Sequence, residues 1–162
     1  MLVTVEMFGG NQMNELELFL PMDLLSCADK RGNEYAWRRK DLLRVADAAE
    51  KAGLASCGGQ VQFRSTDGTF EIKWRSFDPE DRRENEAWNK YVVRSWKETC
   101  LMWQNIFDNE DLIEEGRKIF KIIKETESRE VLPRDALWFV LYFVPAPPDN
   151  GACKHENLSC NL

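Results

Sequence analysis

Histidine is almost absent from this chain of 162 residues, and the single copy, His155, lies near the carboxyl end. Histidine is the usual general base at neutral pH and a frequent metal ligand. Cys57, which precedes two glycines, therefore has no histidine in the body of the chain to activate it as a nucleophile. We expect Cys57 to be a small residue in a loop that leads into a hairpin.

A metal site is also poorly supported. Zinc needs four ligands, whereas Cys153, His155 and Cys160 provide three and form no C-x-x-C pair. The chain has an odd number of cysteines, widely spaced, which favours reduced thiols in a cytoplasm over a disulfide framework. We therefore expect no metal and no other cofactor.

The sequence lacks the segments that direct a chain to membranes or out of the cell. Residues 1–8 have no basic region followed by an apolar core, and no apolar run approaches about 18 residues. These absences predict a soluble cytoplasmic protein. The net charge of −6 argues against direct binding to nucleic acid or anionic membrane, since both require basic surfaces.

Nucleotide-binding and hydrolytic motifs are missing as well: the chain has no G-x-G-x-x-G, Walker loop, H-E-x-x-H or G-x-S-x-G. Two carboxylate pairs, Glu84/Glu86 and Glu114/Glu115, could do acid–base work. Neighbours at such spacing on a helix do not converge on one point, and acids near a helix start are favoured by its dipole. We expect the protein not to be an enzyme.

Length and composition predict one globular domain, residues 1–145, followed by a flexible tail, residues 146–162. The apolar patterns predict a short strand over 1–8, a helix broken at Pro21 and a strand over 136–144 buried on both faces. A helix is predicted over Ala36–Ala52, ended by Gly53. The predicted fold is α+β, a small mainly antiparallel sheet packed against two to four helices.

A hairpin around Asp67-Gly68 is the clearest local prediction. A two-residue loop there would pair Phe63 with Ile72 and Val61 with Trp74 on the buried face. The other face would carry two polar pairs, Arg64 with Glu71 and Gln62 with Lys73. A slip of one residue would expose the aromatic side chains, so the turn and the pattern support each other.

Two helices with acidic starts follow the hairpin. Asp78 and Pro79 would cap the first helix, which has a tryptophan-rich stripe at helical spacing; the stripe comprises Trp88, Val92, Trp96, Thr99, Cys100, Trp103 and Phe107. Residues 108–111 would cap the second helix, whose stripe comprises Leu112, Gly116, Ile119, Phe120 and Ile123. We expect Trp37 and Trp88, at the edges of their patterns, to be partly exposed.

The most informative feature is the charge of this segment. Between Phe77 and Glu115 lie eleven acidic and only five basic residues, a difference that equals the net charge of the whole chain. The tryptophans are typical of a core and the acids of an exposed surface, which predicts a rigid platform for a cationic partner. The candidate partner-binding residues are Asp78, Glu80, Asp81, Glu84, Trp88, Asp108, Glu110, Asp111, Glu114 and Glu115.

Four short stretches, 59–63, 67–74, 86–88 and 95–96, with the sequences GQVQF, DGTFEIKW, EAW and SW, resemble parts of a family of small proteins. These are the cytoplasmic immunity proteins of bacterial polymorphic-toxin and contact-dependent growth inhibition systems. The resemblance implies an antitoxin that binds one cognate toxin domain, often a nuclease, through charge complementarity. Such families share no binding-residue signature, so no site carries over.

Three alternatives stay open. One is a phage-type acidic inhibitor that mimics the charge of nucleic acid. Another is an enzyme whose carboxylates converge only in the folded chain. The last is an adaptor or structural role, which the sequence does not resolve.

Overall fold

A computed structural model describes residues 19–66, 68–109, 111–121, 124 and 136–148, without the side chains of 73–75, 108 and 109. The strand predicted over residues 1–8 lies outside this part of the chain. So do Glu110, Ile123, His155 and almost all of the predicted tail.

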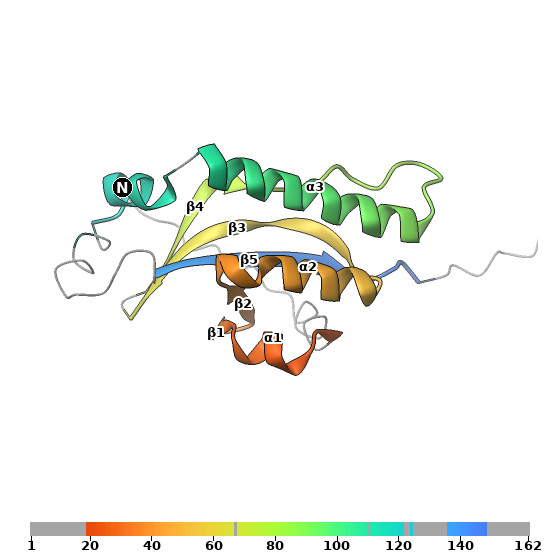
Figure 1. The fold of residues 1–162 in the computed structure, drawn as a ribbon, viewed down its shortest axis with the longest axis horizontal. Helices are drawn as coiled ribbons and strands as arrows, with labels where there is room; N and C mark the ends of the chain where they lie inside the picture. Colours follow the sequence, from red (N-terminus) through yellow and green to blue (C-terminus); the bar gives the residue numbers. More distant parts are fainter. Residues whose placement is uncertain (1–18, 67, 110, 122–123, 125–135, 149–162) are drawn as a thin grey trace, which may run out of the picture.

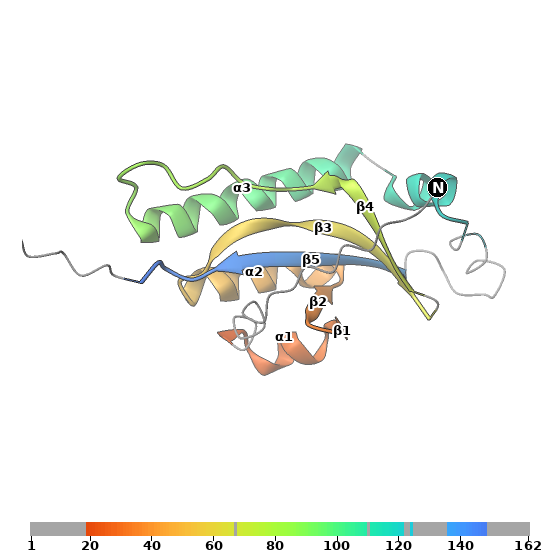
Figure 2. The same ribbon diagram turned by 180° about the vertical axis from the view of Figure 1, so that it is seen from behind.

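The centre of the molecule is a five-stranded sheet in the order β1-β2-β5-β3-β4, in which every pairing is antiparallel (Figure 1). The strands are β1 (Asp29–Arg31), β2 (Glu34–Trp37), β3 (Ala55–Ser65), β4 (Gly68–Ser76) and β5 (Leu137–Val144). The sheet curls, and the tip of the β3–β4 hairpin bends toward β1 (Figure 2). The predicted α+β class with an antiparallel sheet is confirmed.

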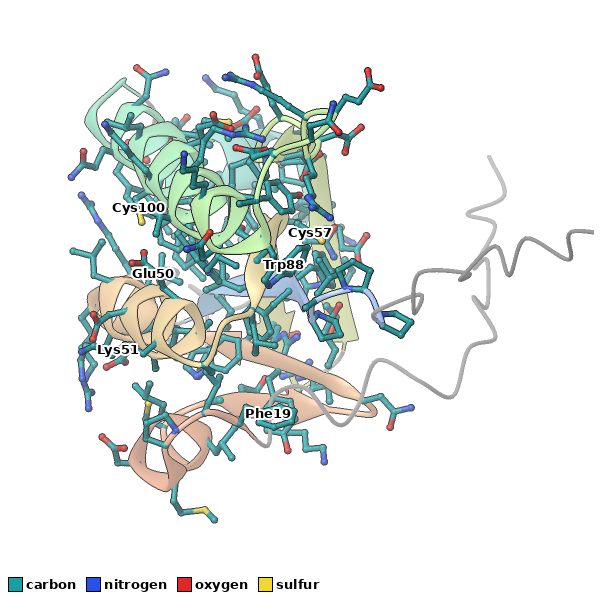
Figure 3. The ribbon with its side chains drawn as sticks, turned by 90° about the vertical axis from the view of Figure 1, so that its right-hand side faces the viewer. Phe19, Glu50, Lys51, Cys57, Trp88 and Cys100 are labelled. Atoms are coloured by element: carbon teal, nitrogen blue, oxygen red, sulfur yellow. The ribbon has the colours of Figure 1, made fainter. Side chains whose placement is uncertain are left out.

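The helices are α1 (Met22–Ser26), α2 (Leu42–Lys51), α3 (Trp88–Asn109) and α4 (Leu112–Ile119), and a short 3-10 turn, η2 (Arg39–Asp41), precedes α2. The long helix α3 packs over β3, and α2 lies beside α3 with the opposite chain direction (Figures 1 and 3). Together α2 and α3 cover one face of the sheet. The opposite face carries polar side chains of β3, β4 and β5.

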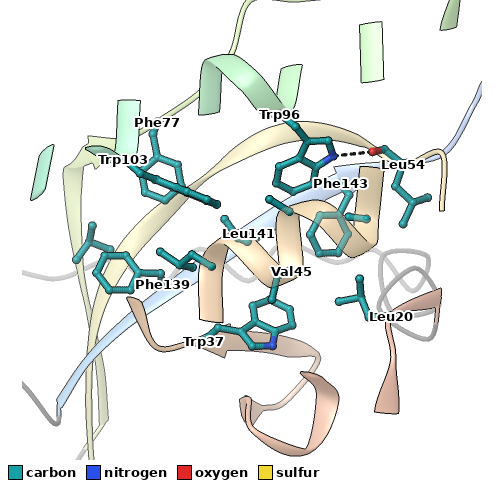
Figure 4. Packing of buried hydrophobic residues seen from close by; sticks show 14 of the residues in the cluster. Leu20, Trp37, Val45, Leu54, Phe77, Trp96, Trp103, Phe139, Leu141 and Phe143 are labelled. Carbon is teal, nitrogen blue, oxygen red and sulfur yellow. Dashed lines mark hydrogen bonds between the residues drawn. The ribbon is translucent and has the colours of Figure 1, made fainter. Parts of the chain in front are cut away.

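Aromatic residues fill the space between sheet and helices (Figure 4). The Trp96 ring lies 5.8 Å from the Phe143 ring, and its indole N–H donates to the carbonyl of Leu54 at 2.8 Å. Trp103 meets Phe77 edge-on at 5.4 Å. Buried indoles usually find a partner for the N–H, and the Leu54 bond fixes the orientation of Trp96 in this core.

The stripe predicted for the tryptophan helix is confirmed: Val92, Trp96, Thr99 and Trp103 are buried, and its other members are half-buried. The strand predicted over 136–144 is also confirmed as β5. It lies between β2 and β3 in the middle of the sheet, with both Phe139 and Val140 buried, as expected for a strand covered on both faces.

The helix predicted from Ala36 is wrong at its start. Ala36 pairs with Val140 in the sheet, and the helix begins at Leu42. Trp37 was expected to be partly exposed but is fully buried, and its indole N–H donates to the carbonyl of Leu24 at 2.9 Å. The predicted end is right, since Gly53 follows the helix with a φ of +74°.

The hairpin forms, but its register differs from the prediction by two residues. Ser65 pairs with Gly68, so Phe63 lies opposite Phe70 rather than Ile72, and Gln62 lies opposite Glu71. Since side chains alternate with a period of two, this shift keeps Phe63 and Ile72 on one face and Gln62, Arg64 and Glu71 on the other. The side chains of Lys73 and Trp74 lie outside the described part of the chain. Cys57 is not in a loop: it lies within β3, where the pairing with β5 shifts register between Ser56 and Gly58.

The first predicted helix start is displaced, whereas the second is confirmed. Asp78 and Pro79 lie in a non-helical segment, and the first helix begins at Trp88. The second begins at Leu112 with Asp111 as its cap, as predicted, although α3 continues to Asn109. This second helix ends at Ile119, which is 44% exposed rather than part of a buried stripe.

Candidate binding site: the acidic loop before helix α3

Residues 78–87, here called the acidic loop, connect β4 to α3 and are anchored at both ends. On one side Phe77 is buried, and its backbone N–H donates to the carbonyl of Gly59 at 3.2 Å. On the other side the indole N–H of Trp88 donates to the carbonyl of Gly53 at 2.8 Å. Trp88 is half-buried, as predicted, and packs edge-on against Tyr91 at 5.4 Å.

Arg94, on the second turn of α3, holds the middle of the acidic loop. Its guanidinium donates to the backbone carbonyls of Glu80 at 3.3 Å and Asp81 at 2.9 Å. It also forms ion pairs with the carboxylates of Glu86 at 2.8 Å and Glu98 at 3.0 Å. The side chain of Arg94 is only 16% exposed, so these charge-assisted bonds are partly shielded from solvent.

Glu86, within the loop, completes this set of bonds to Arg94, here called the Arg94 clamp. Its carboxylate accepts the Arg94 bonds and also the backbone N–H of Arg83 at 3.0 Å. The Arg94 hydrogen bonds are the main reason that the pKa of Glu86 is lowered to about 2. Because Asn85 adopts a left-handed φ of +60°, the chain turns tightly just before Glu86.

The remaining acids of the loop point into solvent. Asp78, Glu80, Asp81 and Glu84 are exposed, and the loop holds five acidic residues against two arginines. Arg83 reaches Glu80 at 3.1 Å, but both side chains are more than 60% exposed, so this pair is weak. The loop therefore presents net negative charge from a backbone that Arg94 fixes in place.

Cys57 lies next to this loop (Figure 3). Burial raises the pKa of its thiol, and the carboxylates of Asp81 and Asp78 raise it further. A raised thiol pKa decreases the thiolate fraction at neutral pH. The environment of Cys57 thus disfavours nucleophilic chemistry.

The acids after α3 form a separate group. The Asp111 carboxylate accepts the backbone N–H of Glu114 at 3.0 Å, and Glu114 pairs with Arg117 at 3.3 Å and Lys118 at 3.9 Å. Glu115, half-buried, belongs to the same helix, whereas the side chain of Asp108 is not described. The 22 residues of α3, about 33 Å, separate this group from the acidic loop (Figure 1). The structure does not bring the predicted acids together in one patch.

A second charged cluster, which the sequence analysis did not identify, lies on the polar face of the sheet. We call it the Arg64 network; its members are Asp29, Glu34, Gln60, Gln62, Arg64, Glu71 and Tyr142. Arg64 has no exposed side-chain surface and pairs with Glu34 at 2.9 Å and Asp29 at 3.2 Å. Its Nε donates to the Gln62 side chain at 2.9 Å.

The rest of the network is bonded as well. The Tyr142 hydroxyl donates to Glu34 at 3.0 Å and accepts from Gln60 at 2.8 Å, while Gln62 donates to both Glu34 and Glu71. Burial, and then the Glu34 carboxylate, raise the pKa of Tyr142 above its usual range. Carboxylates do converge here, but internal donors engage them, as in a structural polar core.

The Arg64 network also joins the two edges of the sheet. Arg64 on β3 donates to the backbone carbonyl of Asp29 on β1, and Arg31 on β1 donates to the carbonyl of Gly68 at the start of β4 at 2.9 Å. These bonds account for the curl of the sheet toward β1. The cluster therefore has an evident role in holding the fold together.

The residues that hold the loop, Arg94 and Glu98, were not predicted, because both fall outside the apolar stripe of the helix. Their spacing of four residues is the signal that could have identified them as a pair. For the Arg64 network the signal is weaker, since alternating polar residues in a hairpin are equally typical of a solvated face.

Within the ranges that the structure describes, no group of three or more histidine, cysteine, aspartate or glutamate side chains could hold a metal ion. No helix in that part of the chain is long and apolar enough to cross a membrane. No protein-family model matches the chain, and neither does any curated protein or solved structure.

Proposed function

We propose that this chain is a cytoplasmic immunity protein that binds a cognate cytotoxic effector domain, a nuclease in the form we favour, and neutralises it. One observation carries the proposal: Arg94 fixes the backbone of the acidic loop through the carbonyls of Glu80 and Asp81 while the loop acids stay exposed. A domain that cleaves nucleic acid needs a basic surface to bind phosphates. A fixed acidic surface is complementary to it.

The clamp matters because ordering a loop on binding costs free energy. A loop that is already ordered in the free protein keeps that cost out of the binding equilibrium. Trp88, at the carboxyl end of the loop, adds a partly exposed aromatic side chain, and Arg82 lies over its ring at 5.7 Å. Aromatic residues next to charged ones are frequent anchors in protein interfaces.

The loop is a better candidate than the acids of α4. Asp111 already caps its helix, and Glu114 already has two cationic neighbours, so both have part of their charge balanced within the chain. At the loop, the carboxylates that pair with Arg94 are Glu86, within the loop, and Glu98, on α3. The exposed acids Asp78, Asp81 and Glu84 are then available to a partner.

The first experiment captures the partner. The tagged protein is incubated with lysate of the cells that carry its gene, at low and at high salt, and eluted proteins are identified by mass spectrometry. We expect one stoichiometric basic toxin fragment that is released at high salt. Capture of a nucleic-acid-binding defence protein would favour the acidic inhibitor instead, and an empty eluate would contradict both.

The second experiment tests the loop itself. A loop variant with Asp78→Asn, Asp81→Asn and Glu84→Gln is compared with a control that removes three exposed acids elsewhere, Asp23→Asn, Asp47→Asn and Glu50→Gln. Both variants change the net charge equally. We expect the association rate with the captured partner to fall about tenfold or more for the loop variant only. Equal rates and equal salt dependence in both variants would refute the electrostatic mechanism.

A further inference from the structure

The outer surface between α2 and α3 carries an apolar groove that neither the fold nor the acidic loop uses. A hollow of about 250 Å³ lies between the helices, and Leu43 on α2 and Val93 on α3 stand at its edges with 60% and 52% of their surface exposed. Large apolar side chains gathered on one surface are typical of an interaction site.

The two sides of this interhelix groove have opposite charges. On the α2 side, Asp47 and Glu50 line the hollow, and on the α3 side, Lys97 lines the same hollow. Cys100 lies at the groove on α3, and in Figure 3 it faces the same side of the molecule as Glu50. Burial and the Glu50 carboxylate both raise the pKa of Cys100, which agrees with their closeness across the groove.

We propose that a second copy of this chain covers the interhelix groove, giving a two-fold symmetric dimer. A two-fold axis along the groove places α2 of each copy over α3 of the other. Residues at one level of the groove remain at that level, so Asp47 and Glu50 of one copy face Lys97 of the other. The apolar side chains of the two grooves meet between these charged rows.

The charge pattern favours a second copy over a different protein. A groove with an acidic side and a basic side complements itself under this rotation, twice per dimer. A uniformly basic partner, such as the toxin proposed for the acidic loop, would meet repulsion from Lys97. This inference does not depend on the proposed function.

The expected dimer is weak. The ten residues of α2 and the 22 of α3 span about 15 Å and about 33 Å, which gives an interface smaller than the roughly 800 Å² per partner of a standard complex. We therefore expect association that depends on concentration. Sedimentation velocity of the full chain from about 1 µM to about 1 mM covers the relevant range of dissociation constants.

Two charge-reversal variants, Lys97→Glu and Glu50→Lys, test the orientation. Each variant alone places like charges opposite each other at both symmetric contacts, so we expect its dimer dissociation constant to rise about tenfold or more. An equimolar mixture of the two variants restores opposite charges at both contacts. We expect the mixture to dimerise as well as the unmodified chain.

Circular dichroism of each variant controls for loss of fold, and Lys40→Glu, at an exposed position of the turn before α2 that does not line the hollow, is the control for charge reversal as such. A chain that is monomeric at every concentration would overturn the proposal. So would a dimer that both single variants leave unchanged, or a mixture that associates no better than either variant alone.

Discussion

Arg64 and Arg94 each hold two carboxylates, and the comparison between them shows how one interaction serves two purposes. Arg64, with no exposed side-chain surface, lies within the curled sheet and pairs with Asp29 and Glu34. Arg94, 16% exposed, lies on α3 and pairs with Glu86 and Glu98. Both guanidinium groups are fully engaged in bonds within the chain, but only Arg94 holds a surface loop.

The difference lies in what each guanidinium binds besides its carboxylates. Arg64 donates to the backbone of β1, so its bonds connect strands. Arg94 donates to the backbone of the acidic loop, so its bonds fix a segment whose own acids remain exposed. The inner cluster neutralises charge and stabilises the fold, whereas the outer cluster uses two acids to position the others.

The largest effect is expected for Arg64→Met. Removing one partner of a buried ion pair leaves uncompensated charge in the interior and typically costs about 3–5 kcal/mol. Because Asp29 and Glu34 are about one third exposed, we expect the free energy of unfolding to fall by the lower end of that range, about 3 kcal/mol. Urea unfolding followed by tryptophan fluorescence measures it.

The matched control for this variant is Lys51→Met, which breaks an ion pair with Asp47 in which both side chains are more than half exposed. Exposed pairs contribute little, so we expect a loss below about 0.5 kcal/mol. Equal losses in the two variants would show that the burial of Arg64 has no energetic consequence and would remove the basis of the comparison.

A smaller and more local effect is expected for Arg94→Met. The loss of several charge-assisted bonds at a partly exposed site predicts a decrease of about 1–2 kcal/mol in the free energy of unfolding. The loop should become mobile while the sheet stays ordered. Hydrogen exchange measures this directly at the amide of Arg83, which donates to Glu86, and at the amide of Glu80, which donates to Glu98.

We expect those two amides to exchange at least about tenfold faster in Arg94→Met, with no change in the amides of β3. In Arg64→Met we expect the opposite: the amides of β3 should exchange faster, because the sheet itself is weakened, while the two loop amides stay unchanged. If Arg94→Met left the exchange of the loop amides unchanged, the loop would be held by something other than this clamp, and the proposed function would lose its main support.

The periodicity of the sequence predicts which residues share a face, but not how two strands are aligned. The buried stripe of α3 and the faces of the hairpin followed from spacing alone, because burial repeats with the period of the element. The register of the hairpin did not, since a shift of two residues keeps every side chain on the same face. Pattern cannot distinguish a turn at Asp67-Gly68 from one that ends a residue earlier.

The start of α3 was mispredicted for a related reason. Asp78 and Pro79 carry the local signals of a helix cap, but the carbonyls of Glu80 and Asp81 accept hydrogen bonds from Arg94. A distant side chain thus decides the conformation of this segment. The exposure of the loop acids could be predicted, whereas their separation from the acids of α4 required the length and direction of α3.

The Arg64 network shows the same limit in the sheet. Gln62 and Arg64 alternate with apolar residues, as in a strand with one solvated face, yet both are buried. Their burial depends on β1, β2 and β5, which the chain brings together only through the order β1-β2-β5-β3-β4. No local pattern in the hairpin contains that information.

The two clusters should also respond at opposite ends of the pH range, and Tyr142 tests the alkaline end. Its pKa is raised in the folded chain, so its contribution to stability is present below about pH 10 and is lost as the pH rises above that value. Near pH 8, Tyr142→Phe should lower the free energy of unfolding by about 1 kcal/mol through lost hydrogen bonds.

Above pH 10 the difference between Tyr142→Phe and the unmodified chain should narrow, because the unmodified chain then loses stability to ionisation of the unfolded tyrosine. Urea unfolding at a series of pH values between 8 and about 11 measures the two slopes. Glu86→Gln is the control, since a change in the acidic loop should leave the alkaline slope unaltered. If the free energy of unfolding changed with pH in parallel for Tyr142→Phe and the unmodified chain, the raised pKa of Tyr142 would be contradicted.

The smallest effect is expected at the acidic end, from Glu86. Its pKa is lowered from 4.5 to about 2, so its contribution to stability is present above about pH 4.5 and is lost as the pH falls toward 2. Glu86→Gln should therefore be less stable than the unmodified chain at neutral pH and approach it in acid. Glu84→Gln removes the same charge from the same loop at an exposed position and is the matched control. An NMR titration of labelled glutamate carboxyls measures the pKa of Glu86 directly. A pKa of Glu86 near 4.5 would mean that the Arg94 clamp does not form in solution. The acidic loop would then lack the rigidity that distinguishes it from an ordinary charged surface.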